Sequence, residues 1–167
     1  MAGGESQRMS PERYFLMYAF PCVRNLLHED KISKKDASTL ESVLFENRKI
    51  ERTYMEFCFP NAFRRIKIIA NEMNKDYWNI DVLKKYWLEE HNKFIDEGDG
   101  AYAYATPTFK ELCKVRKAEV AEIVDKKRSI ILINYDGFSR RVFSTLLPNV
   151  SKGDKVTVHL AYAIERI

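Results

Sequence analysis

The chain has 167 residues, of which 46% are hydrophobic and 31% are charged, and it contains ten Phe, nine Tyr and two Trp. This length and aromatic content predict one medium or two small folded domains and argue against disorder, since disordered chains lack large apolar groups. No run approaches the ~18 uninterrupted apolar residues of a membrane-spanning helix. We therefore expect a folded protein with no membrane association.

The formal charge of +4 is unevenly distributed along the chain. Residues 1–100 hold 16 Lys and Arg against 17 Asp and Glu, whereas residues 101–167 hold 12 against 7. The basic residues of the second part stand singly or in pairs such as Lys126-Lys127 and Arg140-Arg141, which is typical of a solvated surface. Attraction of phosphates or of an acidic partner remains the alternative interpretation.

The three cysteines, Cys22, Cys58 and Cys113, are widely separated. They give neither a disulfide framework nor the paired spacing of a zinc motif, so a reducing, cytoplasmic setting is the simplest expectation. Residues 1–9 are polar and have no apolar core, which predicts a flexible tail rather than a secretion signal.

Residues 10–98 are predicted to form a helical domain of unknown type. Ser10-Pro11 suits a helix start, because the serine oxygen caps free amides and proline in the first turn sacrifices no hydrogen bond. Pro21 should break that helix, and Ser33 with Asp36 should cap the next one. Helices are expected over residues 10–20, 33–47, 50–59, 62–73 and 81–95.

The amino-acid composition changes between Gly98 and Pro107, where small residues dominate, so residues 99–111 are predicted to be a linker. Beyond it, β-branched residues recur with period two and are separated by turn-forming segments at 125–127, 135–137 and 151–154. Several short strands joined by tight turns indicate that residues 112–167 form a small β-barrel, which removes exposed sheet edges. The predicted fold class is α+β, with a helical bundle followed by the barrel.

Three stretches of this C-terminal region carry a family resemblance. They are Tyr135–Val142 (YDGFSRRV), Leu146–Val150 (LLPNV) and Gly153–Ile167 (GDKVTVHLAYAIERI). Together with the run at 120–123, they resemble the HypC/HupF hydrogenase-maturation chaperones. The resemblance implies an OB-like barrel that acts with a scaffold protein, assembling the iron centre of nickel–iron hydrogenases and delivering it to the large-subunit precursor. It implies a chaperone and cofactor carrier rather than an enzyme.

The resemblance also points to particular residues. Cys113 stands seven residues before Val120, where the family's iron-binding cysteine precedes its first strand, and His159 stands where the family has a strand histidine. Gly153 and Asp154 fit the turn before that strand. The resemblance implies that Cys113 and His159 bind iron, as a cyanide- and carbonyl-bearing centre in transit, or bind a partner protein at their shared end of the barrel.

Two interpretations of these side chains are open. The cationic neighbours Lys114, Arg116 and Lys117 would favour the thiolate form of Cys113, a good ligand for low-spin iron. Alternatively, Cys113 is a small residue at a strand entrance and His159 is a half-buried histidine with local hydrogen bonds. The family's cysteine is N-terminal and is followed by a Pro-Gly-type motif, whereas Cys113 is internal and residues 113–119 hold no proline or glycine. A partner-binding role without iron transfer is therefore the alternative form of the predicted function.

The rival function from another class is a nucleic-acid-binding module, because OB-like barrels often bind RNA or DNA strands and this one is basic. An enzyme is not predicted, since no set of nucleophile, acid and base can be assembled from the sequence.

Overall fold

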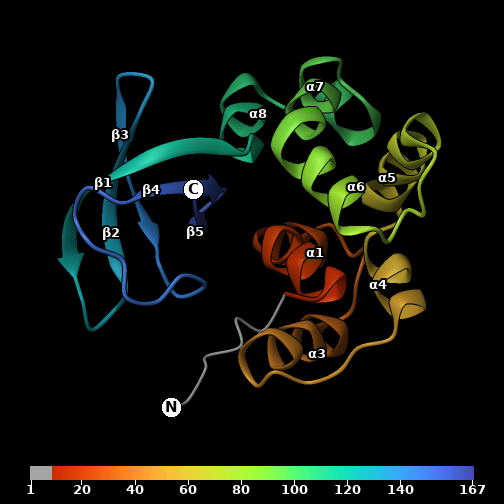
Figure 1. The fold of residues 1–167 in the computed structure, drawn as a ribbon, viewed down its shortest axis with the longest axis horizontal. Coiled ribbons are helices and arrows are strands. Elements are labelled where there is room, and N and C mark those ends of the chain that lie inside the picture. Colours follow the sequence, from red (N-terminus) through yellow and green to blue (C-terminus); the bar gives the residue numbers. More distant parts are fainter. Residues whose placement is uncertain (1–8) are drawn as a thin grey trace, which may run out of the picture.

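The computed structural model describes residues 9–167, so nearly all of the predicted tail lies outside the described residues. A helical bundle and a β-barrel lie side by side, joined through α8 (Figure 1). The helical part consists of α1 (Pro11–Ala19), the 3₁₀ turn η1 (Phe20–Cys22), α2 (Val23–His28), α3 (Lys34–Phe45), α4 (Arg52–Cys58), α5 (Pro60–Met73), α6 (Ile80–Lys85), the π turn η2 (Tyr86–Glu90), α7 (His91–Asp96), the 3₁₀ turn η3 (Gly100–Tyr104) and α8 (Pro107–Cys113). Within residues 9–167, no helix is both long and apolar enough to cross a membrane.

The predicted helix starts are confirmed by their caps. The Ser10 side chain accepts a hydrogen bond from the Arg13 N–H at 3.2 Å. Ser33 and Asp36 form a reciprocal capping box, with each side chain bonded to the other residue's backbone N–H. Pro21 interrupts the first helix as predicted, and the chain passes through η1 before α2 begins.

The helix predicted over residues 81–95 contains a π turn. α6 ends at Lys85, η2 adds one wide turn, and α7 continues to Asp96. Such turns shift the positions that follow around the helix axis. Here Tyr86, Trp87 and His91 are all buried, with at most 3% of each residue exposed.

The segment predicted to be a linker contains a helix that the sequence analysis missed. α8 occupies Pro107–Cys113, and its start carries ordinary signals, since the Thr106 side chain caps the Phe109 N–H at 3.2 Å and Pro107 occupies the first turn. The first strand begins at Arg116 rather than at Val120.

The C-terminal region is a closed five-stranded barrel, which confirms the predicted α+β fold with an OB-like barrel. Its strands are β1 (Arg116–Asp125), β2 (Ile130–Tyr135), β3 (Phe138–Phe143), β4 (Lys155–His159) and β5 (Tyr162–Arg166). They follow the order β1-β2-β3-β5-β4, with β4 pairing back to β1, and only the β3–β5 pair is parallel. This is the strand order of an OB-type barrel. Its interior is filled by apolar side chains, among them Val120, Ile133, Val142, Val156 and Val158.

The bundle core is built on aromatic rings around Phe15 of α1. Its ring centroid lies 4.5 Å from that of Phe63 and 5.8 Å from that of Trp87. Two residues from the barrel region, Val115 and Ile164, are buried in this same core. The barrel and the bundle therefore share a packed apolar interface.

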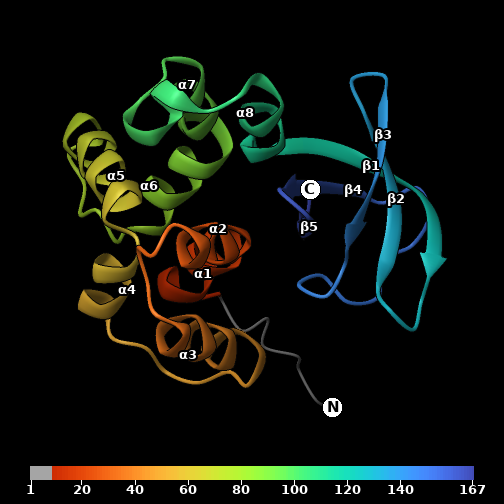
Figure 2. The ribbon, with the colours of Figure 1, turned by 180° about the vertical axis from the view of Figure 1, so that it is seen from behind.

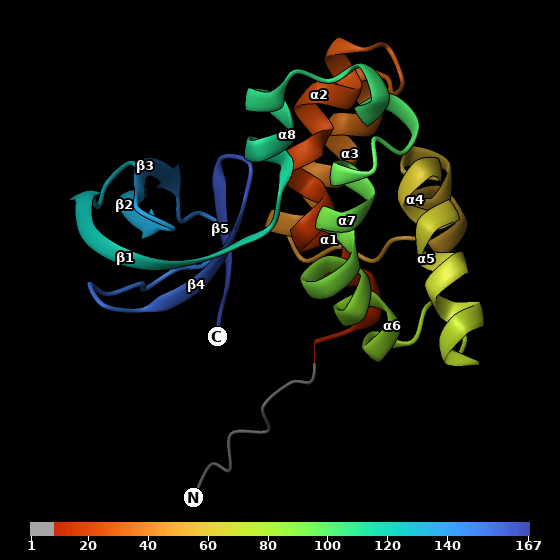
Figure 3. The same cartoon turned by 90° about the horizontal axis from the view of Figure 1, so that it is seen from above.

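Polar contacts reinforce this interface between α1 and β5. The phenol groups of Tyr14 and Tyr18 both donate to Glu165 Oε1, at 3.0 and 2.5 Å. Figure 2 shows α1 and α2 on the side of the bundle that faces the barrel, and Figure 3 shows β5 lying between the rest of the barrel and the helices.

Asn92 of α7 fixes the entry of the chain into the barrel. Its amide donates to the Val115 carbonyl at 2.8 Å and accepts from the Val115 N–H at 2.8 Å. One side chain thus satisfies both backbone groups of a residue that is 8% exposed. Unpaired, these groups would carry a desolvation cost.

We expect Asn92→Ala to lower the free energy of unfolding by about 1–3 kcal/mol or more, because it leaves a buried N–H and a buried carbonyl without partners. Urea titration of both proteins measures the change. Asn71→Ala, at an exposed position of α5, is the control and should shift stability by less than about 0.5 kcal/mol. Equal stability of the Asn92→Ala and Asn71→Ala proteins would contradict the stabilising role of the Asn92–Val115 hydrogen bonds.

Candidate functional site

A cavity of about 400 Å³ lies within the helical part, against the junction with the barrel. Apolar and aromatic side chains form most of its wall, and all three cysteines of the chain line it. The other functional groups on the wall are Asn25, Glu29, Lys31, Asn61, Arg65, Tyr86, Trp87, His91 and Tyr102. A largely apolar pocket with a few convergent polar groups is the default candidate for a binding site.

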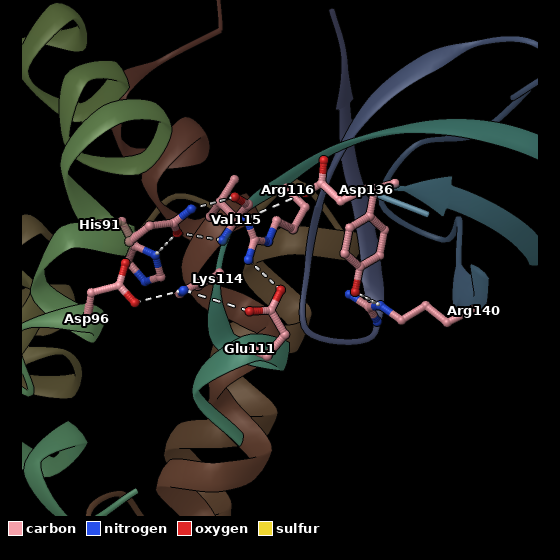
Figure 4. A network of polar contacts seen from close by, with 10 residues as sticks. His91, Asp96, Glu111, Lys114, Val115, Arg116, Asp136 and Arg140 are labelled. Carbon is pink, nitrogen blue, oxygen red and sulfur yellow. Dashed lines mark hydrogen bonds and ion pairs between the residues drawn. The ribbon is translucent and has the colours of Figure 1, made fainter. Parts of the chain in front are cut away.

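Cys113, the predicted iron ligand, ends α8 at the edge of this cavity and is only 2% exposed. Burial raises the pKa of its thiol to about 12, so the thiol is protonated at neutral pH. Of the two interpretations of Cys113, the raised pKa favours the small buried residue over the thiolate. Two of the three cationic neighbours are engaged elsewhere, since Lys114 pairs with Asp96 at 2.7 Å and Arg116 pairs with Glu111 (Figure 4).

His159 ends β4 and is completely buried. Its Nδ1 lies 2.6 Å from the carbonyl oxygen of Tyr18, which can only accept, so Nδ1 carries the proton. Burial lowers the pKa of the ring to about 4 and keeps it neutral. Nε2 therefore presents a lone pair on the other side of the ring.

The structure brings the two predicted residues to one junction. The Leu160 N–H, directly after His159, donates to the carbonyl of Leu112, directly before Cys113, at 3.1 Å. The backbone carbonyl of Tyr18, in α1, contacts His159 at this same junction. The barrel end that was predicted to bind a partner is thus occupied by the bundle.

Cys22, which the sequence analysis did not select, has its thiol next to the imidazole of His159. Its Sγ lies 3.9 Å from Nε2, the ring nitrogen that can accept the thiol proton. Cys22 sits in η1, the turn that Pro21 imposes, and is half-buried while lining the cavity. Burial raises the pKa of this thiol well above its ordinary value. No spacing signal could have linked residues 137 positions apart.

A second buried histidine stands beside this pair. The ring of His91 packs edge-on against that of His159, with centroids 5.1 Å apart, and only 2% of His91 is exposed. Burial and the neighbouring imidazole lower the pKa of His91 well below its ordinary value. The indole N–H of Trp87, also on the cavity wall, is buried and has no acceptor among the described residues.

Gly153 and Asp154 have a local structural role. Gly153 has φ of +92°, a conformation that favours glycine, and forms the turn before β4. The Asp154 carboxylate accepts from the Ser151 N–H at 2.9 Å and from Arg166 Nε at 3.1 Å. This turn lies at the opposite end of β4 from His159.

No group of three or more His, Cys, Asp or Glu side chains within residues 9–167 is arranged to hold a metal ion. Comparison with models of protein families and with curated proteins gives no match to this chain. The resemblance to the HypC/HupF chaperones therefore stays a prediction.

The buried histidines should make stability depend on pH. We expect the free energy of unfolding to fall as pH drops from about 6.5 towards 4, because imidazoles of the unfolded chain bind protons that buried His159 does not. The loss should be about 1.4 kcal/mol per pH unit for each such histidine. Urea titrations at several pH values measure it.

His159→Gln should reduce this pH slope, whereas His28→Gln, at an exposed position of α2, should leave it unchanged. Equal slopes for the His159→Gln and parent proteins would show that this imidazole is not the group responsible.

Proposed function

We propose that this chain is an accessory protein of nickel–iron hydrogenase metallocentre assembly that binds a maturation scaffold protein or the large-subunit precursor without passing iron through Cys113. The observation that supports it is the junction at which an OB-like barrel brings Cys113 and His159 together. The HypC/HupF resemblance implies a cysteine and a histidine in these positions.

Iron carried as cargo on Cys113 does not fit the residues around it. The thiol is buried and protonated, whereas a thiolate is the form that binds metal. Its backbone nitrogen is part of a peptide bond inside the chain and offers no free amine. The proposal is therefore limited to protein binding.

The proposed partner surface is the outer side of the barrel, because the helices cover the Cys113 end. A groove of about 660 Å³ runs between β1, β4 and the tip of the β2–β3 hairpin, and Lys117, Tyr135 and Asp136 are among its lining residues. Phe138 follows this tip, is 64% exposed, and has its ring centroid 6.2 Å from that of Tyr135. An exposed aromatic side chain beside a groove is a typical anchor for a protein partner.

We expect Phe138→Ser to weaken capture of the scaffold protein or the precursor at least tenfold, because it removes the apolar anchor. Anaerobic pull-down with graded partner concentrations measures this. Phe57→Ser is the matched control, since Phe57 of α4 is 66% exposed on the bundle and should be neutral. Cys113→Ser should capture the partner like the parent and without bound iron.

Capture that is unchanged by Phe138→Ser would place the partner elsewhere. Failure of the parent chain to capture either protein would remove the proposed function itself. Iron that accompanies the parent chain and is lost with Cys113→Ser would restore the carrier version.

A second candidate, binding of single-stranded nucleic acid, is favoured by one observation on the outer face of β3. Phe143 is 41% exposed, its ring centroid lies 5.7 Å from that of Tyr162, and exposed Arg141 stands two residues before it on the same face. OB-type barrels stack bases on aromatic side chains beside cationic groups.

A salt series separates this candidate from the first. Under the leading proposal we expect oligonucleotide binding, measured by fluorescence anisotropy, to be weak and unaffected by Arg141→Gln. Tight binding that falls steeply with salt and weakens in Arg141→Gln would favour the nucleic-acid function, because displacement of counterions makes phosphate binding salt-dependent.

A further inference from the structure

The wall of the cavity in the helical part carries a buried cation. Arg65 of α5 lines the cavity and is 5% exposed. Its guanidinium carbon lies 5.6 Å from the ring centroid of Phe94 and 5.2 Å from that of Tyr102, and its Nε donates to Asp99 Oδ2 at 2.6 Å. Nη2 donates to the backbone carbonyl of Asp99 at 3.3 Å. These contacts hold the guanidinium in one place and leave Nη1 for another acceptor.

The charged groups around this wall leave an excess of positive charge. The Asp99 carboxylate pairs with Arg64 as well as with Arg65, so one anion is shared between two cations. The other two charged side chains that line the cavity, Glu29 and Lys31, pair with each other. A buried anion needs a cationic or hydrogen-bonding partner, and this wall supplies one. A ligand with one negative charge therefore suits the cavity.

Tyr86 supplies a second hydrogen-bond donor. The residue lines the cavity and is 1% exposed. Its O–H has no acceptor within residues 9–167, yet its oxygen is not among the unpaired side-chain atoms that are closed off from solvent. The small exposed part of Tyr86 is therefore its hydroxyl, which faces the cavity. The Arg65 guanidinium is close by, since it opposes the burial that raises the pKa of Tyr86 to about 12.

The rest of the wall suits an aromatic body. The rings of Phe59, Trp87 and Phe109 line the cavity, and aromatic rings favour offset or edge-to-face packing with one another. A cavity of about 150 Å³ is enough to bind benzene, so this one, of about 400 Å³, has room for two fused rings. Two lining residues, Asn61 and Ala101, are exposed, and a ligand can enter beside them.

We propose that the cavity binds an aromatic monocarboxylate, with its rings among the aromatic side chains and its carboxylate accepting hydrogen bonds from Arg65 Nη1 and the Tyr86 hydroxyl. Hydrogen bonds to a charged group are the stronger kind, and an apolar pocket with a few polar groups that fix orientation is typical of small-molecule sites. The site uses neither the Cys113 thiol nor the outer face of the barrel, so it does not depend on the proposed function.

Isothermal titration calorimetry of the parent chain with 2-naphthoate tests the site. We expect one 2-naphthoate per chain, and binding of the neutral analogue 2-naphthalenemethanol that is at least tenfold weaker. Tyr86→Phe keeps the ring and should weaken 2-naphthoate binding at least tenfold, because a hydrogen bond to a charged group is lost. Tyr104→Phe is the matched control, since Tyr104 of η3 is 95% exposed and does not line the cavity.

Ala62→Phe, which places a ring at the cavity wall, should also abolish binding, and a melting curve shows whether each variant is folded. If Ala62→Phe does not fold, the comparison of Tyr86→Phe with Tyr104→Phe still decides. Absence of 2-naphthoate binding to the parent chain, or equal affinities of the Tyr86→Phe and Tyr104→Phe proteins, would overturn the proposal. Tighter binding of the aliphatic carboxylate decanoate than of 2-naphthoate would overturn the aromatic class. Partner capture measured without any carboxylate ligand keeps this result separate from the proposed function.

Discussion

A neutral imidazole at the junction of barrel and bundle constrains the rest of the site. His159 is the last residue of β4, yet its Nδ1 donates a hydrogen bond to the backbone carbonyl of Tyr18 in α1. A charged ring would be costly in this buried place, so the hydrogen bond and the burial together select one tautomer. The direction of the Nε2 lone pair, and hence the pairing with Cys22, follows from that choice.

The junction is held by polar groups set into an apolar interface. Asn92 pairs with both backbone groups of Val115, and two tyrosines of α1 share the carboxylate of Glu165. Apolar contacts alone are non-directional and would tolerate sliding of one surface on the other. These hydrogen bonds have few alternative partners in a buried setting, so they define one relative position of barrel and bundle.

Local rules in the sequence predicted much of the fold but little of the site. Ser10, Ser33 and Pro21 act within one helical turn, and period-two alternation is equally local, so the first helices and the barrel were predictable. The start of α8 carried a readable signal at Thr106 that the small-residue composition around it obscured. The burial of Cys113 and the approach of Cys22 to His159 depend on how α1 docks on the barrel, which neither spacing nor composition encodes.

The docking of the helices also decides which part of the barrel is available for function. To expose the Cys113 end, the chain would have to withdraw Val115 and Ile164 from the bundle core, at about 1.5–3 kcal/mol for each side chain. It would also have to break the hydrogen bonds from Tyr14 and Tyr18 to Glu165, and water would have to solvate the freed polar groups. The two side chains alone contribute about 3–6 kcal/mol, which keeps the open form below roughly one molecule in a hundred. A partner that required this end would have to supply that free energy from its own contacts, whereas one that binds the outer face near Phe138 finds its surface already exposed. Under the proposed function, the helical region would therefore favour recognition at the outer side of the barrel over recognition at the Cys113 thiol.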